Sequence, residues 1–401
     1  MMVMAANRSV TRTAVPKFGS AGEVERSYAM RRELRGLDGL SGSAAAKGPM
    51  PELYPRDGFR ALTELESRIS EIAGVSKESL LAYPAGMSSI VAAAESAHPT
   101  QGTTLLLGKE HYTETPRYVD EHLRPRGVKV VRADSGNARE LDAAIRKHDP
   151  DIILLETVSN GVSMPVVDIP ALFASIKASG KSPLVILDNT LPTSTILAPG
   201  ALLGDGSVTV AVVESGTKAY ARNSEMLGIL YTNNNELYTS LYSARITVGY
   251  TPTPSAVETI TSSLPDSKED FDRRNRAVFA NTLTLARALE QVSGQVSGLT
   301  VTHPNLSGHQ NKQLSDSLNP DGVSPVFYIN NGKDQFELTD LLMQDGTVRE
   351  LCEIGQSFGF DKTRIYPYYG NPFVRIAGGA SHSSDEVGEL ANALASALKR
   401  A

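Results

Sequence analysis

The chain has 401 residues, of which 41% are hydrophobic, so it can bury a substantial core. Its 39 basic and 45 acidic residues are spread along the chain and give a formal net charge of -6, which disfavours nucleic acid as a partner. The single cysteine, Cys352, excludes an internal disulfide and any multi-cysteine metal site. We find no apolar run long enough for a membrane helix and no signal-peptide core, so we expect a cytoplasmic protein without a membrane partner.

The first part of the chain predicts an extended arm followed by two helices. Residues 1 to about 50 are rich in Gly, Ala, Ser and Arg and show no sustained periodicity, apart from a short helical stretch at 23–35. From Gly58 the spacing of Leu62, Leu65, Ile69 and Ile72 indicates an amphipathic helix that ends at Gly74. The small-residue segment 85–97 predicts the second helix.

Apolar runs of strand length then alternate with helical patterns, at 104–108, 128–132, 151–156, 184–188 and 209–214. Such alternation predicts an α/β fold with a mainly parallel, doubly wound sheet. After residue 250 we expect a long polar helix at 268–292, strands at 324–329 and 373–377, and a last helix at 384–399. The predicted organisation is an arm (1–60), a large domain (61–250) and a smaller C-terminal α+β domain (251–401).

The polar residues that directly follow the predicted strands indicate the chemistry, because ligands bind outside the carboxyl ends of strands in open α/β sheets. Three such ends carry polar groups: LLETVSNG with Asn160, VILDNT with Asp188 and Thr190, and VAVVESGTK with Ser215, Thr217 and Lys218. An acid at one strand end and a lysine at the next are what a pyridoxal phosphate site requires. The acid keeps the pyridine nitrogen protonated, and the lysine forms a Schiff base.

A phosphate also needs hydrogen-bond donors. The spacing of Ser215 and Thr217 before Lys218 brings two hydroxyls toward such a group. The segment Pro84-Ala85-Gly86-Met87-Ser88 places a glycine turn at a predicted helix start, where free N–H groups favour an anion. An ordinary helix cap explains this segment equally well.

Taken in order, several segments of the chain resemble the Cys/Met-metabolism pyridoxal phosphate enzymes, which have fold type I and include cystathionine γ-synthase, cystathionine γ-lyase and methionine γ-lyase. The resemblance starts near Tyr54 and runs through YPRDGFRALTELE, YPAGMSSIVAA, ETVSNGVSMPVVDI, ILDNTLPT, ESGTKAYARNSEMLG, TPTPSAVETI and FVRIAGG.

The resemblance implies roles for individual residues. Lys218 is expected to hold the cofactor and act in catalysis, and Asp188 to pair with its ring nitrogen. Gly86, Met87, Ser215 and Thr217 resemble the phosphate cradle, and Thr190 is expected to bind the cofactor too. Tyr112 falls where the family places a tyrosine that stacks on the cofactor ring, and we expect it to be catalytic as well.

Further roles concern the substrate and the neighbouring subunit. Arg375 resembles the arginine that grips the substrate carboxylate. Ser357 falls where the family has a turn next to that carboxylate, and Asn160 is expected to bind the substrate as well. Tyr54 and Arg56 match a Tyr-x-Arg pair that a neighbouring subunit donates to the cofactor site, with Tyr54 also near the substrate. A homodimer at least, and a homotetramer by analogy with the family, is therefore expected.

The chain departs from the family around this site. After the Tyr-x-Arg pair, Gly-Asn-Pro-Thr becomes residues 57–60, and after the lysine Gly-Gly-His-Ser-Asp becomes Ala221-Arg222-Asn223-Ser224-Glu225, which adds bulk and a positive charge. The region after Ser357 also differs and introduces Asp361, Lys362, Arg364, Tyr366, Tyr368 and Tyr369. An unusual amino-acid substrate in a specialised pathway, or neutral drift, explains these changes.

The expected reaction is γ-elimination or γ-replacement on an amino acid, through aldimine and vinylglycine-type quinonoid intermediates. A β-eliminating C–S lyase and a non-catalytic pyridoxal-phosphate-binding regulator are the alternatives. A nucleotide-binding enzyme is disfavoured because the nearest phosphate-loop match, SIKASGKS, lacks its first glycine. The seven histidines show no metal-ligand spacing, so no metal is expected.

Overall fold

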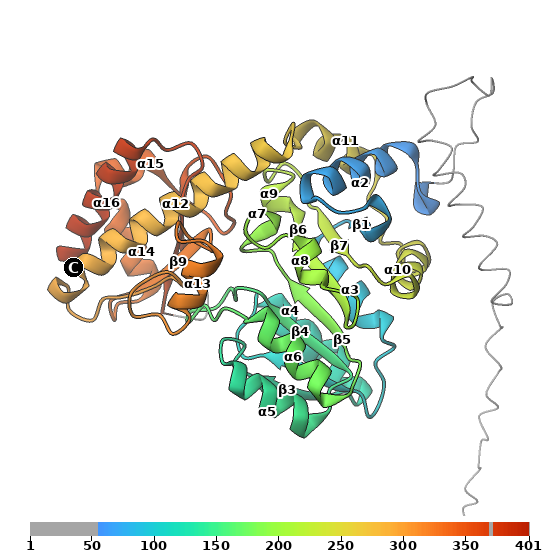
Figure 1. Cartoon of the computed structure of the whole chain (residues 1–401). Helices are drawn as coiled ribbons and strands as arrows, with labels where there is room; N and C mark the ends of the chain where they lie inside the picture. The colour runs from blue at the N-terminus through green and yellow to red at the C-terminus, as the bar shows by residue number, and fades with distance from the viewer. Residues whose placement is uncertain (1–54, 369–371, 401) are drawn as a thin grey trace, which may run out of the picture. The chain divides into compact units, whose positions relative to one another are not determined.

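A computed structural model describes residues 55–368 and 372–400, and Figure 1 shows the path of the chain. Two β-sheets organise this part of the protein, one built from strands between residues 80 and 231 and the other from strands between residues 300 and 377. Most of the predicted arm, including Tyr54, lies outside the described residues. The predicted domain boundary near residue 250 falls between the two sheets and stays a prediction.

The first sheet has seven strands in the order β1-β7-β6-β5-β4-β2-β3. Every neighbouring pair is parallel except the two pairs that include β7, so the predicted mainly parallel α/β fold is confirmed. The five predicted strands agree with the structure to within one residue at each end, whereas β1 and β7 were missed because four-residue strands carry too little pattern. The strands are β1 (Leu80–Tyr83), β2 (Thr104–Gly108), β3 (Lys129–Ala133), β4 (Ile152–Glu156), β5 (Leu184–Asp188), β6 (Thr209–Ser215) and β7 (Gly228–Tyr231).

Helices cover both faces of this sheet. On one face, alternate strand residues such as Ile153 and Val185 share a core with helices α2 (Arg60–Ala73), α5 (Ala138–His148), α6 (Ile169–Ser179) and α8 (Pro199–Leu203). Helix α3 (Gly86–Ser96) lies on the other face. Gly228 of β7 approaches this helix so closely that an added Cβ would fall 2.0 Å from the Ala85 carbonyl oxygen. The next residue, Ile229, belongs to the core that contains Ile153 and Val185.

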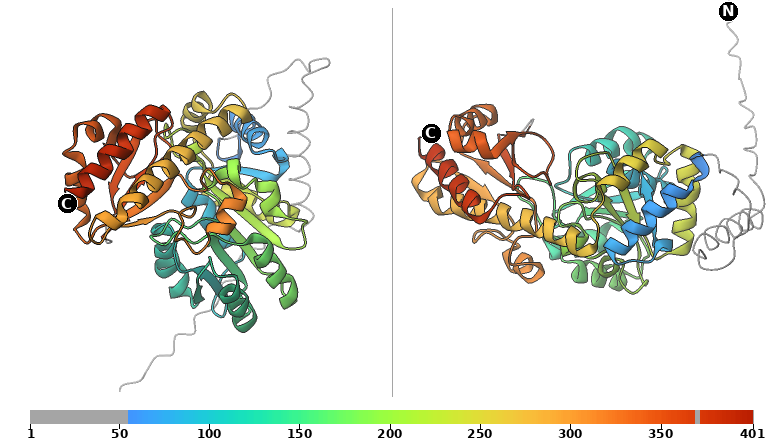
Figure 2. Two further views of the ribbon diagram at one scale, coloured as in Figure 1. Left: turned by 60° about the vertical axis from the view of Figure 1, so that its left-hand side comes forward. Right: turned by 90° about the horizontal axis from the view of Figure 1, so that it is seen from above.

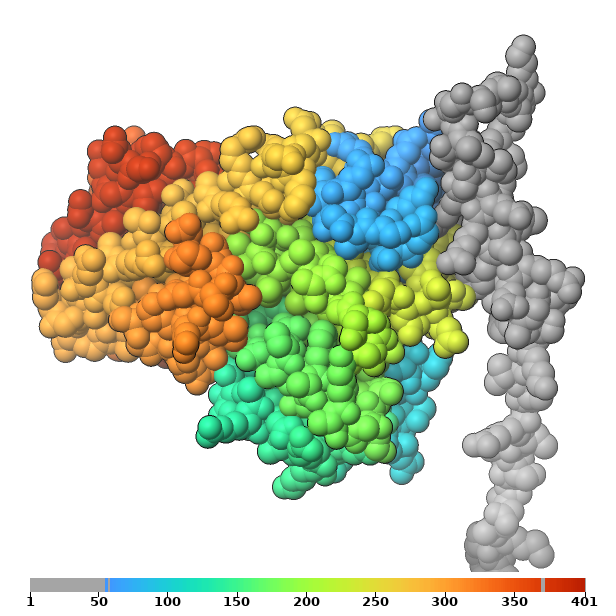
Figure 3. All heavy atoms as spheres, viewed as in Figure 1, coloured from blue at the N-terminus to red at the C-terminus, as the bar shows by residue number. Residues whose placement is uncertain are grey.

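The remaining helices of this part are short or lie at its edge. Helix α11 packs along α2, and Figure 3 shows their surfaces meeting. These helices are α4 (Glu114–Tyr118), α7 (Thr193–Ile196), α9 (Gly216–Ala219), α10 (Asn235–Val248) and α11 (Pro254–Ser263). Within the described residues, no helix combines the length and apolarity that crossing a membrane requires.

The second sheet has five strands in the order β10-β11-β12-β9-β8. Only β10 and β11 run parallel, and the other neighbours are antiparallel. The strands are β8 (Thr300–Thr302), β9 (Val326–Asn330), β10 (Cys352–Ile354), β11 (Thr363–Pro367) and β12 (Val374–Ala377), and the helices of this part are α13 (Lys312–Leu318), α14 (Gln335–Met343) and α15 (Gly346–Leu351).

Two long helices frame the second sheet. Helices α12 (Lys268–Val292) and α16 (Ser384–Lys399) have the predicted bounds and pack against each other. Ser267 caps α12, and Ser383 forms a capping box with Glu386 at the start of α16, which explains why both helices begin there. Because α12 also contacts α2 and α7, it connects the two sheets, as Figure 2 shows.

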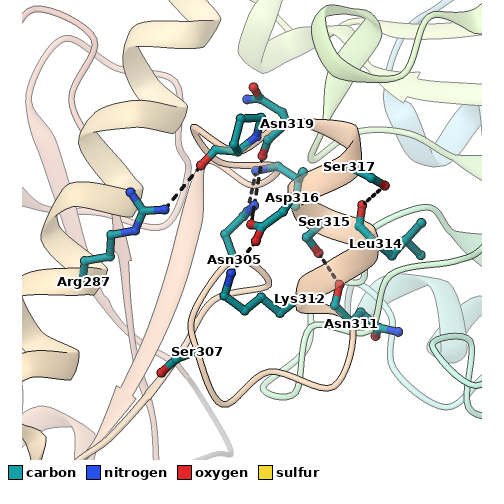
Figure 4. A network of polar contacts seen from close by, with 12 residues as sticks. Arg287, Asn305, Ser307, Asn311, Lys312, Leu314, Ser315, Asp316, Ser317 and Asn319 are labelled. Atoms are coloured by element: carbon teal, nitrogen blue, oxygen red, sulfur yellow. Dashed lines mark hydrogen bonds and ion pairs between the residues drawn. The ribbon is translucent and has the colours of Figure 1, made fainter.

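A polar network holds the segment around α13 in shape. Figure 4 shows Asn305, Lys312 and Asp316 converging. The Asn305 side-chain amide donates to Asp316 and to the Asn319 carbonyl oxygen, both at 2.9 Å. Asn311 then bridges to the first sheet, because its amide donates to the Gly136 carbonyl at 2.8 Å and its oxygen accepts from the Val166 N–H at 3.1 Å. This segment therefore binds loops that follow β3 and β4 of the first sheet.

Candidate active site

The carboxyl ends of three neighbouring strands form the candidate site. Strands β4, β5 and β6 end in Glu156, Asp188 and Ser215, and Glu156 pairs with Asp188 in the register. Helix α9 follows β6 directly and carries Lys218, whose Nζ donates to the Ser215 Oγ at 2.8 Å. Because parallel strands end at one edge of the sheet, residues that are distant in the chain meet here.

The environment of Lys218 favours an uncharged amine. Burial lowers the pKa of Lys218 to about 8, the nearby Asp188 carboxylate opposes this shift, and the Arg375 charge adds to it. The Phe358 ring centroid lies 5.8 Å from the Lys218 Nζ and provides part of the apolar surroundings. An amine with this pKa is substantially uncharged slightly above neutral pH, as a nucleophile or a base must be.

Asp188 is oriented by Thr190. One Asp188 oxygen accepts from the Thr190 N–H at 2.9 Å and from its hydroxyl at 2.5 Å. The Thr190 hydroxyl oxygen in turn accepts from the Ser215 N–H at 2.8 Å, which ties the ends of β5 and β6 together. Burial raises the pKa of Asp188, whereas the two bonds from Thr190 and the Lys218 charge lower it.

The start of α3 lies against Ser215. An added Cβ on Gly86 would lie 3.0 Å from the Ser215 Cβ, so this close approach favours glycine. Ala85 provides no side-chain cap for the first N–H groups of α3. Met87 follows Gly86 in the first turn, and its Sδ lies 3.9 Å from the Thr115 hydroxyl. The helix start therefore offers backbone donors beside a hydroxyl, as an anion site requires.

Thr217 points elsewhere in this structure. Its hydroxyl accepts from the Leu227 N–H at 2.9 Å and donates to the Leu227 carbonyl oxygen at 3.3 Å. These two bonds fix the loop between α9 and β7. The role of Thr217 in holding a phosphate stays a prediction.

Arg375 of β12 lies buried among polar and aromatic groups. Its guanidinium donates to the Asn160 side-chain oxygen at 3.4 Å and to the Gln356 carbonyl oxygen, and Asn160 also accepts from the Tyr328 hydroxyl at 2.9 Å. The rings of Tyr366 and Tyr368 lie 5.4 and 5.8 Å from the Arg375 Cζ. The structure therefore brings together Arg375 of β12 and Asn160 of the loop after β4, two of the residues predicted to bind the substrate. Their role in binding the substrate stays a prediction.

Glu156 holds the segments that carry Tyr112 and Asn160. One of its oxygens accepts from the Tyr112 N–H at 2.7 Å and the other from the Asn160 N–H at 2.6 Å. Burial and the neighbouring Asp188 raise the pKa of Glu156. The Tyr112 side chain is 37% exposed, and burial of its hydroxyl together with the Glu114 charge raises its pKa, so the phenol stays protonated at neutral pH.

For three further residues that were predicted to bind the cofactor or the substrate, Ser357, Arg56 and Tyr54, the structure does not test the role. The Ser357 hydroxyl donates to the Asn223 side-chain oxygen at 2.8 Å. Arg56 lies in the short 3-10 helix η1 (Pro55–Asp57) with an exposed side chain, and its carbonyl oxygen accepts from the Thr251 hydroxyl at 2.7 Å. Tyr54 and Tyr369 fall outside the described residues. The roles of Ser357, Tyr54 and Arg56 stay predictions.

Most of the charged residues that distinguish this chain are paired away from Lys218. Arg222 binds Asp270 of α12 at 2.7 Å. Asp361 binds Arg274 at 2.7 Å, and Arg364 binds Glu353 at 2.8 Å. The extra positive charge expected from Arg222 is therefore balanced by a carboxylate. Tyr366 and Tyr368 of the same region, in contrast, lie with their rings beside the Arg375 guanidinium.

Cys352 is 2% exposed, and burial raises the pKa of its thiol to about 12. A thiol with this pKa stays protonated at neutral pH, and only the thiolate is a good nucleophile. Cys352 therefore packs as a small apolar side chain.

A buried carboxyl that the sequence analysis missed lies beneath Asp188. Glu214 of β6 accepts from the Asn189 side-chain amide at 2.8 Å, and the Tyr231 hydroxyl lies 3.5 Å from its other oxygen. Burial raises the pKa of Glu214 to about 8, the bond from Asn189 lowers it, and the charge of Asp188 raises it. An acidic residue inside the apolar run VAVVES is the signal that could have revealed it.

We expect Glu214→Gln to change the pH dependence of stability. The folded protein holds the Glu214 proton up to about pH 8, whereas the unfolded chain releases it near 4.5, so the wild type should lose stability between these values. The glutamine of the variant is neutral at every pH. Between these values the free energy of unfolding of the variant should therefore rise relative to that of the wild type by about 1 kcal/mol per pH unit. Urea unfolding at pH 5 and pH 8 measures this difference. Glu258→Gln, at an exposed position, is the control. If the unfolding free energy of Glu214→Gln depended on pH as that of the wild type does, Glu214 would not be buried as a neutral carboxyl.

Comparison with known proteins identifies the family. The model of the family described as Cys/Met metabolism PLP-dependent enzyme matches residues 42–365, which include Lys218 and Asp188. The chain belongs to this family. Its members depend on pyridoxal phosphate (PLP), so the chain belongs to a family of PLP-dependent enzymes.

Individual relatives are distant. The chain is 27% identical over 263 residues to a cystathionine beta-lyase of Lactococcus lactis subsp. cremoris and 29% identical over 198 residues to the chloroplastic mimosinase of Leucaena leucocephala. These matches cover 65% and 49% of this chain but only 64% and 42% of the length of the relatives. The crystal structure of cystathionine gamma synthase from Xanthomonas oryzae pv. oryzae in complex with cystathionine superposes with a TM-score of 0.71 at 17% identity, covering 90% of this chain and 92% of the other, which supports fold type I.

The residues present fit PLP. Gly86 and the uncapped start of α3 form a cradle that a side chain would fill, and phosphate is the group such a cradle favours. Lys218 has the lowered pKa that an amine needs for a covalent link. Asp188 offers a carboxylate for a protonated ring nitrogen.

Proposed function

We propose that this enzyme catalyses γ-elimination or γ-replacement on an amino acid. The observation that carries the proposal is the joint placement of Lys218, Asp188 and Arg375. Asp188 ends β5 and Lys218 follows the neighbouring strand β6, while the turn at 356–359 contacts both Arg375 and Lys218. A lysine, an acid and a carboxylate-binding arginine in one site are the groups that amino-acid chemistry with PLP needs. PLP, when bound, supplies an electron-withdrawing ring that stabilises negative charge at the substrate Cα.

The side chains of this chain then divide the work. Arg375 binds the substrate carboxylate in a bidentate pair, and Asn160 holds the guanidinium in place. Lys218, as a free amine, removes the proton from Cα and, for γ-chemistry, a second proton from Cβ. Tyr112 keeps its phenolic proton at neutral pH and donates it to the departing group. Loss of a β-substituent needs only the first proton removal, and the similarity to a cystathionine beta-lyase makes β-elimination the second candidate.

Product analysis distinguishes these reactions. The holoenzyme is incubated with γ- and β-substituted amino acids, and the products are identified by mass spectrometry. The expected result is a four-carbon keto acid or a γ-replaced amino acid, whereas a three-carbon keto acid from β-substituted substrates alone would favour β-elimination. Absence of turnover and of any change in cofactor absorbance with every amino acid would contradict both candidates.

The proposal includes a homodimer at least, with a homotetramer expected from the family, and a location in the cytoplasm. Arg56 lies in the short helix η1 with an exposed side chain, a position compatible with reaching a second subunit. A buried cysteine without a second cysteine to pair with suits a reducing compartment.

A shared active site predicts complementation. Arg56→Ala and Lys218→Ala, each inactive alone, should partly rescue one another when mixed, unfolded and reassembled. Some hybrid dimers then contain one site built wholly from intact parts, so up to about a quarter of the wild-type activity should return, as expected for random pairing of equal amounts of two chains. Native mass spectrometry confirms that hybrids form. Hybrids without activity would place Arg56 in the site of its own subunit or outside any site.

A further inference from the structure

The loop that follows Lys218 adopts an unfavourable backbone conformation. Arg222 and Asn223 have φ angles of 48° and 61°, in the left-handed region that side chains disfavour. Two successive residues in this region persist only where the surroundings hold them. Asn223 is also a departure from the family pattern, which has a histidine at this place.

The contacts of Asn223 show what holds it. Its N–H donates to the Thr217 carbonyl oxygen at 2.7 Å, within the segment 217–224, which we call the lysine loop. Its side-chain amide donates to the Phe358 carbonyl oxygen at 3.0 Å, and its side-chain oxygen accepts from the Ser357 hydroxyl at 2.8 Å. One side chain therefore binds both the backbone and a hydroxyl of a turn that lies more than 130 residues further along the chain.

The turn that Asn223 binds, residues 356–359, contacts both ends of the proposed substrate site. The Gln356 carbonyl oxygen accepts from the Arg375 guanidinium. At the other end Gly359, with φ 81°, packs on Lys218 so closely that an added Cβ would lie 3.3 Å from the Lys218 carbonyl oxygen. Arg274 of α12 donates to the Gly359 carbonyl at 3.1 Å and supports the turn from outside.

We propose that Asn223 is a positioning residue that sets the separation between Lys218 and Arg375 by clamping the 356–359 turn to the lysine loop. The inference rests on the proposed function, in which the substrate amine meets Lys218 while its carboxylate meets Arg375. A bidentate guanidinium–carboxylate pair depends on its geometry, and a displacement of about 1 Å costs up to roughly 100-fold in such sites. Losing the clamp therefore weakens recognition of the carboxylate specifically.

The test compares two probes that differ only in the carboxylate. Dissociation constants of L-alanine and L-alaninamide are measured with the holoenzyme from the change in cofactor absorbance, and the amide-to-acid ratio reports the arginine contact. In Asn223→Gly, which accepts the positive φ and removes the side chain, this ratio should fall about tenfold or more with PLP content unchanged. Ser224→Ala is the matched control, because the Ser224 hydroxyl donates to the Ala221 carbonyl oxygen within its own loop at 2.7 Å. The ratio should not change in this variant.

A double-mutant cycle separates positioning from general loosening. In an Arg375→Ala background, Asn223→Gly should cause little further fall in the ratio, because the two residues act through the same contact. A ratio within twofold of wild type in Asn223→Gly would overturn the clamp. If that variant fails to retain PLP, Asn223→Asp replaces it in the test. Asn223→Asp keeps the acceptor for Ser357 but loses the donor to Phe358, and its amide-to-acid ratio should fall as well. A wild type that does not distinguish the two probes would overturn the proposed function and the clamp with it.

Discussion

Lys218→Ala should yield a protein that holds no covalently linked PLP and turns over amino acids roughly 10⁴-fold more slowly than wild type. Lys218 supplies an amine with a pKa of about 8 beside the Asp188 carboxylate, and alanine supplies neither a nucleophile nor a base. Reduction with borohydride followed by peptide mapping measures the link directly. The wild type should carry the label on the peptide that contains Lys218, and the variant should carry none.

Lys181→Ala is the matched control for this experiment. Lys181 is an exposed lysine that binds Asp149 at 2.8 Å, on the surface of the same part of the protein. Its removal should leave both the label and turnover at wild-type levels. If the wild type carried the label on a lysine other than Lys218, Lys218 would not be the residue that is linked to PLP.

Asp188→Asn should retain PLP but lower turnover by roughly 10² to 10⁴-fold. The amide has nearly the same shape and can still accept from Thr190, so the site should stay assembled. It carries no negative charge, however, and cannot keep the ring nitrogen protonated while charge develops at the substrate Cα. Steady-state kinetics and the absorbance of the bound cofactor measure the two effects separately.

Asp151→Asn provides the comparison, because Asp151 lies at the opposite end of β4 and accepts from the Thr104 N–H at 2.7 Å. This variant should keep its turnover, although stability falls modestly. If Asp188→Asn turned over at a rate close to the wild-type value, the ring nitrogen would need another partner and Asp188 would lose its role.

Local patterns in the sequence were sufficient for most of the first sheet and for the long helices. The strands β2, β4, β5 and β6 are continuous apolar runs because they are buried on both faces, and the bounds of α12 and α16 follow from Ser caps and helical periodicity. The same reasoning failed at β1 and β7, which are four residues long, at β8 and β10, which are three, and at the five-residue β11, which ends in Pro367. Runs this short do not distinguish a strand from a turn.

The candidate site, too, was predicted from the sequence only in part. Asp188 and Lys218 were found because each follows an apolar run and because parallel strands bring their ends to one edge. Glu214 was missed because a single acid within a strand gives no sign of its partners. Its bonds to Asn189 and Tyr231 come from neighbouring strands, and the strand order that makes them neighbours is a property of the folded sheet.

The sequence by itself determined the α/β class, the family, and the lysine, acid and arginine expected to act on an amino acid. Only the tertiary structure decided how these groups are held relative to one another. Arg375 meets Asn160 across 215 positions of the chain, and Asn223 meets Ser357 across 134. Contacts of this kind depend on how two separately formed sheets pack, and packing is set by many side chains together, so no local pattern encodes it.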